Sequence, residues 1–192
     1  MGMSASRLAA QTIRVLPRKG LSRALGWLTS AQAPQPIVEA AVRAFVKAYD
    51  VDLSEVDMPE AGFRTFDDFF TRRLRAGARP VDPDPTALVS PADGKMEDLG
   101  PITAEGGLTV KGQPYTAASL LGDPDDAKAY EGGRYFIVYL SPRDYHRVHA
   151  PTCGDVQYVR YVPGSLFPVN RIGTENIPQL FARNERLAIV QE

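Results

Sequence analysis

The sequence changes character at Pro80, and this change constrains the fold more than any other feature. Before it, apolar residues recur at spacings of three and four, which is the period of an amphipathic helix. After it, Pro80, Pro83, Pro85 and Pro91 exclude a long helix, and the later apolar segments are short and separated by glycine. We therefore expect an α+β protein in which N-terminal helices precede a β-rich core, built like a barrel or a sandwich.

Three helices are expected before Pro80. The first covers Leu21–Leu28, where apolar residues and basic neighbours suit a lipid headgroup boundary, with burial against the rest of the protein as the alternative. The second begins near Pro36, because proline is favoured in the first turn of a helix. The third covers Thr65–Leu74 and is capped by its first residue. Between the first two, Ala31–Pro36 contains two prolines and forms a hinge.

The core is expected to contain short strands bounded by glycine and proline. Tyr135–Leu140 is apolar almost throughout, as for a central strand, whereas Val156–Val162 includes Gln157 and Arg160, as for a strand with one solvated face. The predicted strands are Ala87–Ser90, Gly107–Lys111, Tyr135–Leu140 and Val156–Val162, and a short helix is predicted at Thr116–Leu121.

Charge is distributed unevenly along the chain. The net charge of −1 combines about +5 over residues 1–50 with about −6 over residues 51–192. We expect a basic amphipathic leader at 1–35 that contacts a membrane, a helical segment at 36–80 and a catalytic core at 81–192. A basic leader on an acidic body is typical of a protein that rests on an anionic membrane surface, and a solvated terminus is the plainer alternative.

The leader does not read as a membrane span. No apolar run approaches the roughly 20 residues that cross a bilayer, and Gln11 and Arg14 interrupt a secretory apolar segment. An organelle transit peptide stays open, because the leader contains arginine and its first acidic residue is Glu39. Cys153 is the only cysteine, so no intrachain disulfide can form and a reducing compartment fits best.

Both histidines, His146 and His149, lie in the segment Ser141–Pro151. Histidine exchanges protons near neutral pH, so this segment is the candidate site for acid–base chemistry. Pro142 and Pro151 make a long helix unfavourable there and predict a rigid loop after a strand.

A carboxylate that could serve these imidazoles stands at Asp93, in Pro91–Gly94. An Asp-Gly pair is most often an ordinary turn, but a turn at the end of a strand could also present the carboxylate to a histidine and fix its tautomer. No nucleophile is evident, because Ser165 lacks the Gly-x-Ser-x-Gly elbow of hydrolases.

Other ligand chemistry is weakly represented near the two histidines. His146 and His149 have no further histidine or paired cysteine to complete a metal site, so no metal is expected. Arg143 and Arg147 could clamp a carboxylate or phosphate, or could form surface salt bridges.

Several blocks of the chain occur together in a specific order. They are Phe69–Leu74 leading to Arg79-Pro80, Pro91–Gly94, Lys111-Gly112 with Tyr115, Ser141–Pro151, Pro163–Asn170 and Leu180–Arg186. From about Leu21 to the C-terminus the sequence resembles phosphatidylserine decarboxylase proenzymes. The longer bacterial and mitochondrial branch, which carries N-terminal membrane-contacting helices, is the better match.

The resemblance implies a self-processing enzyme. Asp93 and His149 match the pair that activates a serine in a Gly-Ser dipeptide, and cleavage there leaves a pyruvoyl group. That group forms a Schiff base with the amine of phosphatidylserine and accepts electrons as carbon dioxide leaves, giving phosphatidylethanolamine. His146 matches a second histidine that donates a proton or positions the substrate. The substrate-binding residues expected from the resemblance are Tyr145, Arg147 and Asn170.

The chain departs from this pattern at its end. It stops at Glu192 without a Leu-Gly-Ser-Thr-like processing site or a small α subunit. We therefore expect the β-subunit part of a zymogen, inactive alone and with an incomplete core until an α chain from the same proenzyme supplies the pyruvoyl cofactor. The expected partners also include phosphatidylserine and an anionic membrane; no nucleic-acid partner is expected, and a homodimer of αβ units stays open.

Two other functions compete with this one. The first is an inactive lipid-binding module at a membrane surface, and the second is a hydrolase that uses Ser165. The expected location is peripheral, on the cytoplasmic face of a bacterial inner membrane, with the mitochondrial inner membrane as the alternative.

Overall fold

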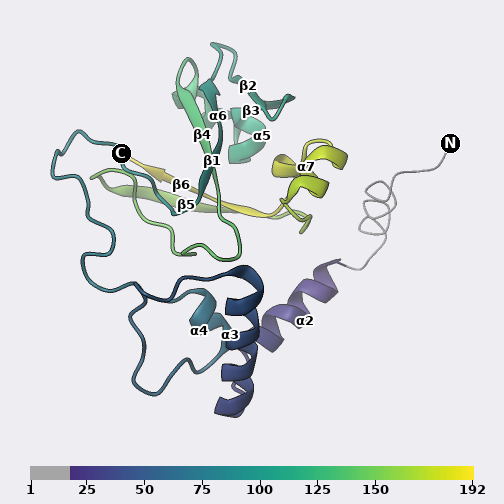
Figure 1. The fold of residues 1–192 in the computed structure, drawn as a ribbon. Helices are drawn as coiled ribbons and strands as arrows, with labels where there is room; N and C mark the ends of the chain where they lie inside the picture. Colours follow the sequence, from purple (N-terminus) through teal and green to yellow (C-terminus); the bar gives the residue numbers. More distant parts are fainter. Residues whose placement is uncertain (1–17) are drawn as a thin grey trace. The chain divides into compact units, whose positions relative to one another are not determined.

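The computed structural model describes residues 18–192, which form two compact units (Figure 1). Unit 2 comprises Ala24–Glu97 and Val138–Cys153, and unit 1 comprises Asp98–Ile137, Gly154–Glu192 and the first residues of helix α2. Residues 1–17 of the predicted leader lie outside the described part. Val138–Cys153, which falls within the predicted core, belongs to the same unit as the residues of α3 and α4. The division into leader, helical segment and core stays a prediction.

The two longest helices among residues 18–192 were both predicted. Helix α2 (Arg18–Ser30) contains the expected amphipathic segment, and helix α3 (Gln35–Tyr49) has proline in its first turn. Trp27 of α2 is 74% exposed. None of the helices among residues 18–192 is both long and apolar enough to cross a bilayer.

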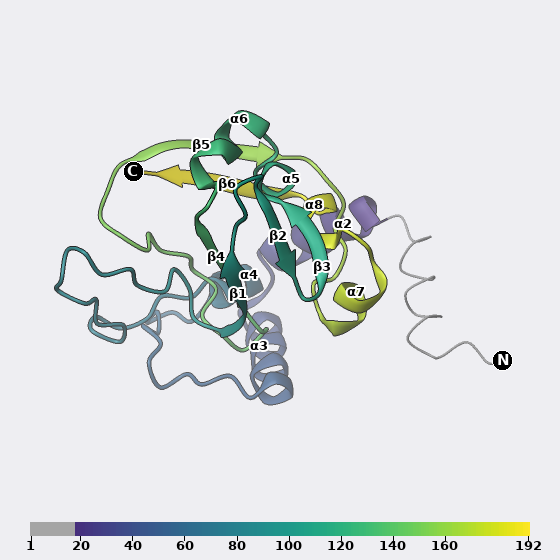
Figure 2. The same cartoon turned by 90° about the horizontal axis from the view of Figure 1, so that it is seen from above.

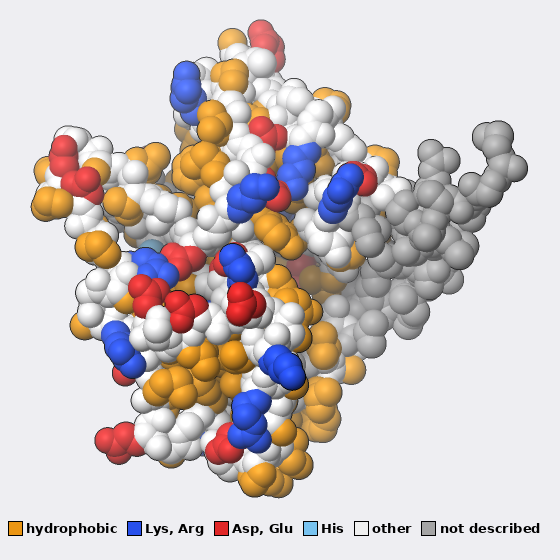
Figure 3. Space-filling view, viewed as in Figure 1, with side chains coloured by type: hydrophobic (Ala, Val, Ile, Leu, Met, Phe, Trp, Pro, Cys, Tyr) orange, Lys and Arg blue, Asp and Glu red, His pale blue; other side chains and the backbone are white. Residues whose placement is uncertain are grey.

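The core of unit 2 forms where α3 packs on α4 (Phe66–Phe70). Val38 and Val42 of α3 are buried, as is Phe69 of α4. The Phe45 ring meets the edge of the Phe69 ring at 5.8 Å between centroids. Edge-to-face aromatic pairs add to the stabilisation from burial, so this cluster anchors α4 below the histidine segment. Hydrophobic side chains also reach the surface over α3 (Figure 3).

Helix α4 is shorter than the predicted Thr65–Leu74. Its N-cap is as expected, since the Thr65 hydroxyl accepts a hydrogen bond from the Asp68 N–H at 3.0 Å. The helix ends at Phe70 because the chain beyond it pairs with another segment: Leu74 forms an antiparallel bridge with Val56. The backbone groups of residues 73 and 75 also bond to residues 57 and 55, so they are not available for helical bonds.

Strands β1 (Lys95–Pro101) and β4 (Arg134–Tyr139) pair with each other, and the chain passes between the two units within them. Strand β4 was predicted, but it is partly exposed rather than central. The strand predicted at Ala87–Ser90 is wrong, because that segment forms no ladder: its backbone bonds are a turn bond from Ala87 N–H to Asp84 O at 3.0 Å and a single bond from Val89 N–H to Pro151 O at 2.8 Å. Asp93 therefore precedes a strand rather than following one.

Unit 1 begins with a tight hairpin of β2 (Gly107–Val110) and β3 (Gln113–Thr116). Its two-residue loop, Lys111-Gly112, has φ of 49° and 75°, as a type I′ turn requires. The predicted helix follows as α5 (Ala117–Leu121), capped by Thr116. Helix α6 (Pro124–Ala127) and the 3₁₀ helix η1 (Lys128–Tyr130) complete this part (Figure 2).

The second half of unit 1 is the antiparallel pair of β5 (Val156–Val162) and β6 (Arg186–Gln191). Strand β5 was predicted, but its more exposed face carries the apolar Val159 and Tyr161 rather than only polar side chains. Helices α7 (Arg171–Asn176) and α8 (Leu180–Arg183) lie between the strands in sequence.

Helices and strands together make the predicted α+β class. The strands of residues 18–192 form three two-stranded sheets, and no closed barrel exists among them. The barrel or sandwich form of the core, and its completion by an α chain, stay predictions.

Candidate active site

The candidate site lies within unit 2, where Ser141–Pro151 forms the predicted loop after β4. The loop is held against the end of α4 by two arginines. The buried Arg72 donates from Nη2 to the carbonyls of Arg143 and Asp144 at 2.9 and 3.1 Å. Arg147 donates from Nε to the Thr71 carbonyl at 2.8 Å. Arg147, predicted to bind substrate, thus uses one of its donors to anchor the loop.

A tight turn begins the loop. The Asp144 N–H donates to the Ser141 carbonyl at 3.0 Å, and the Ser141 N–H donates to the Asp144 carboxylate at 2.6 Å. Aspartate commonly closes turns in this way, so Asp144 fixes the direction in which the following residues leave β4.

The Asp93 turn lies directly beside the histidine loop. The His149 N–H donates to the Pro91 carbonyl at 2.7 Å, which joins the two segments by their backbones. At Gly94, φ is 139°, and a Cβ atom would lie 2.4 Å from the Tyr139 carbonyl oxygen. Only glycine fits this close approach, so Gly94 is required by packing as well as by the bend of the chain.

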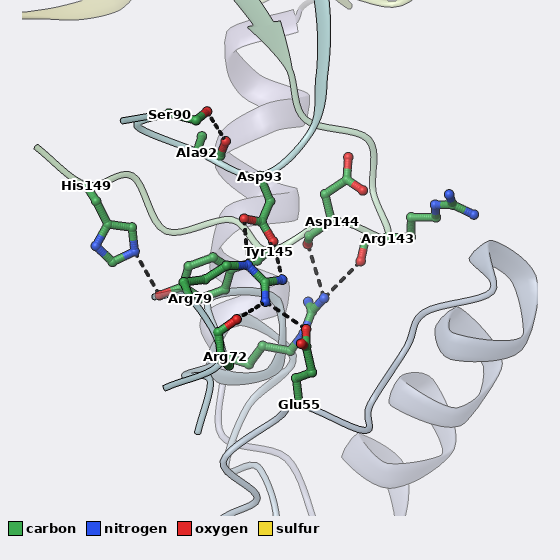
Figure 4. Close-up of polar contacts among 11 residues, drawn as sticks. Glu55, Arg72, Arg79, Ser90, Ala92, Asp93, Arg143, Asp144, Tyr145 and His149 are labelled. Carbon is green, nitrogen blue, oxygen red and sulfur yellow. Dashed lines mark hydrogen bonds and ion pairs between the residues drawn. The ribbon is translucent and has the colours of Figure 1, made fainter. Parts of the chain in front are cut away.

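The Asp93 carboxylate is paired with Arg79 (Figure 4). Arg79 Nε lies 3.0 Å from both carboxylate oxygens, and Nη2 lies 2.5 Å from Oδ2. Arg79 Nη1 donates to Glu55 Oε2 at 2.8 Å. The hydrogen bonds that Arg79 donates to Asp93, and to a lesser extent those to Glu55, raise the pKa of Arg79. Sequence reasoning noted Arg79-Pro80 as a motif but did not link it to Asp93.

His149 is exposed, and its ring is held by Tyr145. Its Nε2 lies 3.0 Å from the Tyr145 hydroxyl, and the two rings stack at 5.6 Å between centroids. The expected hydrogen bond between Asp93 and His149 is not formed among residues 18–192. Their segments are adjacent, but each side chain is held by a different partner. Tyr145, predicted to bind substrate, is buried and contacts the imidazole.

His146 lies in a different environment, half-buried against α4. Its ring stacks on Phe70 at 4.0 Å between centroids, and its Nε2 lies 3.0 Å from the Ser141 carbonyl oxygen. Burial is the main cause that lowers the pKa of His146; the hydrogen bond to the Ser141 carbonyl opposes it, the Arg72 charge adds to it, and the Asp144 charge opposes it without reversing the direction. The imidazole is therefore neutral at pH 7, with Nε2–H donating to the carbonyl and Nδ1 as the basic nitrogen.

Two pockets flank Asp93 and share its side chain. One, of about 340 Å³, includes Glu55, Arg79 and Tyr145 in its wall. The other, of about 870 Å³, is lined by Ser90 and Lys95 as well. Their polar walls provide room for a charged group or a polypeptide segment next to the carboxylate.

The remaining predicted residues lie apart from this cluster in the chain. Asn170 belongs to unit 1, where its Oδ1 caps α7 by accepting from the Gly173 N–H at 3.2 Å. Ser165, the hydrolase candidate, also belongs to unit 1, and its backbone pairs with the segment at Asn184. No group of metal-ligating side chains is found within residues 18–192.

Comparison with known proteins identifies similar chains. The family model described as phosphatidylserine decarboxylase matches residues 66–192. The phosphatidylserine decarboxylase proenzyme of Brevibacillus brevis is 42% identical over 94% of this chain, and that of Anaeromyxobacter sp. (strain K) is 46% identical over 97%. The corresponding proenzyme of Shewanella halifaxensis is 44% identical over 93%. The chain spans 62–66% of the length of these three relatives.

Proposed function

The chain belongs to the phosphatidylserine decarboxylase family, and from this premise we propose that it is the β-subunit part of such an enzyme. With an α chain from the same proenzyme it would convert phosphatidylserine to phosphatidylethanolamine and carbon dioxide. The pyruvoyl group, formed by self-cleavage at a serine of the α segment, would supply the electron sink for the loss of carbon dioxide.

One observation carries this proposal: the backbone bond from His149 to Pro91 holds the histidine loop against the Asp93 turn. A base and a carboxylate are thereby brought together by segments more than 50 residues apart in the chain. The large pocket beside Asp93 offers space for an entering serine segment. These residues fit the formation of a pyruvoyl group from a serine, because the step requires a base and an orienting acid.

His149 is the proposed base for self-cleavage. It is exposed, and its Nδ1 makes no hydrogen bond to any part of the chain that the structure describes. In the tautomer whose Nε2–H donates to the Tyr145 oxygen, Nδ1 keeps the lone pair that could accept the serine proton. Asp93 lies on the adjacent segment and would hold the imidazolium if the side chains rearranged to bring a ring N–H to the carboxylate.

His146 is proposed to position the substrate rather than to store a proton. Burial against Phe70 keeps the ring neutral, and Nε2–H is committed to the Ser141 carbonyl. The remaining Nδ1 can accept a hydrogen bond from a polar headgroup. Of the two roles expected for this histidine, orientation of the substrate agrees better with its environment.

We also propose that α2 contacts an anionic membrane surface, on the cytoplasmic face of a bacterial inner membrane or at the mitochondrial inner membrane. Three large apolar side chains of the helix, Leu25, Trp27 and Leu28, are 58–74% exposed. Such side chains enter the headgroup region when a basic helix lies on anionic lipid. The same exposure favours the second candidate function, an inactive lipid-binding module.

The decisive test joins this chain, after Glu192, to the part of the Brevibacillus brevis proenzyme that it does not match. We call this protein the completed chain. Intact mass should show self-cleavage and a pyruvoyl terminus, and labelled phosphatidylserine should release carbon dioxide. The binding module would be supported by a different pair of results. The folded chain would float with anionic liposomes, and it would not be cleaved when joined to either the Brevibacillus or the Anaeromyxobacter segment.

A further inference from the structure

Arg79 binds the Asp93 carboxylate through two nitrogens of its guanidinium group. Nε contacts both oxygens at 3.0 Å, and Nη2 contacts Oδ2 at 2.5 Å (Figure 4). Two donors on one rigid plane define the orientation of a carboxylate far better than a single point charge does. The rotamer of Asp93 is therefore set by Arg79 rather than by the turn alone.

The guanidinium is itself held from its far side. Nη1 donates to Glu55 Oε2 at 2.8 Å and to the Ala78 carbonyl at 2.6 Å. Glu55 comes from the segment that also pairs with the residues after α4, since its carbonyl accepts from the Arg75 N–H at 2.8 Å. Glu55, Arg79 and Asp93 thus form one chain of charged hydrogen bonds whose ends lie on different segments of unit 2.

The contacts with Arg79 leave the Asp93 carboxylate able to accept a further hydrogen bond. A carboxylate offers about four lone-pair sites, and Arg79 places its closest contact on Oδ2. Among residues 18–192, Oδ1 accepts a hydrogen bond from Arg79 Nε alone, so it retains capacity for an imidazole N–H. The arrangement suits a residue that aims the carboxylate while leaving one oxygen for the base.

The competing explanation is that the Glu55–Arg79–Asp93 contacts serve only the stability of the fold. The Arg79 and Glu55 side chains are 45% and 48% exposed, and ion pairs at such exposure contribute little to folding stability because water screens them. Asp93 is less exposed, at 28%, but its ion pair still has one partner in water. Three donors spent on one exposed and one partly exposed carboxylate are therefore poorly explained by stability alone. Orientation of Asp93 explains them directly.

We propose that Arg79 is a positioning residue that fixes the Asp93 carboxylate for self-cleavage, with Glu55 holding the guanidinium in place. The inference rests on the proposed function, because it concerns the same reaction. It predicts that geometry matters as well as charge, so lysine should replace arginine poorly.

The test measures the rate of self-cleavage in the completed chain. Arg79→Ala should slow cleavage about 100-fold and Arg79→Lys about 10-fold or more, within the range of effects of a misplaced catalytic group. Glu55→Gln should have a smaller effect. Arg75→Ala is the matched control, since Arg75 donates to the Val56 carbonyl without touching Asp93, and it should cleave normally.

Chemical rescue separates positioning from folding. Millimolar guanidinium should restore cleavage in Arg79→Ala by filling the vacated place, whereas urea at equal concentration should not. Guanidinium should leave Asp93→Ala inactive. The melting temperature of Arg79→Ala should change by no more than about 3 °C, as expected for an exposed ion pair.

The outcomes distinguish this inference from the function it rests on. If the unaltered completed chain folds but does not cleave itself, both the proposed function and the inference about Arg79 are overturned. If it cleaves and Arg79→Ala or Arg79→Lys cleaves equally fast, only the inference is overturned. Loss of cleavage in Arg79→Ala without rescue, together with a large fall in melting temperature, assigns Arg79 a structural role instead.

Discussion

The two histidines stand three residues apart but occupy opposite kinds of environment. His146 is half-buried between the Phe70 ring and the Ser141 carbonyl, whereas His149 is exposed and its ring stacks on and hydrogen-bonds to Tyr145. The first imidazole is held neutral by its surroundings, since burial lowers its pKa. The second keeps one ring nitrogen accessible to an incoming group.

The family resemblance assigned one histidine to self-cleavage and the other to the substrate, and the two environments give a physical reason for this division. A buried neutral ring with one committed nitrogen can orient a ligand through the other nitrogen, and an exposed ring beside a carboxylate turn can exchange a proton with a partner chain. The contrast predicts that substitutions at the two positions will damage different steps.

The largest effect is expected at the exposed histidine. In the completed chain, His149→Ala should reduce self-cleavage on the order of 10²–10⁴-fold, because the serine loses its base. Asp93→Ala should act in the same direction, and intact mass over a time course measures both. Normal cleavage in both variants would remove the proposed pair from the mechanism.

The half-buried histidine should affect the other step. His146→Ala should leave self-cleavage within about threefold of the unaltered protein and reduce carbon dioxide release by on the order of 10²-fold, since the substrate loses an orienting contact. The decarboxylation rates of His146→Ala and the unaltered protein are compared after both have been cleaved. Equal damage to cleavage and decarboxylation would show that the two histidines do not divide the work.

Tyr145 provides a smaller perturbation of the exposed ring. Tyr145→Phe keeps the stacked ring but removes the hydroxyl 3.0 Å from His149 Nε2, so we expect self-cleavage to slow about 10-fold through a less well oriented imidazole. Decarboxylation by already cleaved enzyme serves as the internal control. A rate unchanged by the substitution would mean that the hydroxyl does not orient the base.

The smallest effect concerns the ring that buries His146. Phe70→Leu should raise the pKa of His146 toward its ordinary value, because water then reaches the imidazole, while costing about 1 kcal/mol of stability. The imidazole signals in an NMR titration of the 192-residue chain measure the shift. A further decrease in the pKa of His146 would contradict burial as its main cause.

The same comparison fixes the sign of a pH effect on stability. His146 resists protonation in the folded protein, so below pH of about 6.5 the unfolded chain binds a proton that the folded chain does not. The contribution of His146 should therefore make folding less stable as the pH falls through this range, and Phe70→Leu should weaken that dependence. The free energy of unfolding, measured with denaturant at several pH values and compared with that of His146→Ala, isolates the contribution of His146.

Local patterns predicted the elements that depend on neighbours in sequence. The apolar spacing of α3, the Thr65 cap, the short helix at Thr116–Leu121 and the β5 segment were all confirmed. The strand at Ala87–Ser90 was wrong because apolar character cannot show whether a partner strand is present. Strands β1, β3 and β6 were missed, since their sequences alternate weakly and they form by pairing with β4, β2 and β5.

The sequence by itself determined the family blocks, the α+β class and the loop that contains both histidines. The tertiary structure decided the partners of the key side chains: Asp93 binds Arg79, and His149 binds Tyr145. It also decided that His146 is buried against Phe70. Periodicity and propensity describe interactions within a few residues, whereas these contacts depend on how separate segments pack, so the environment that sets each group's charge and orientation emerges only on folding.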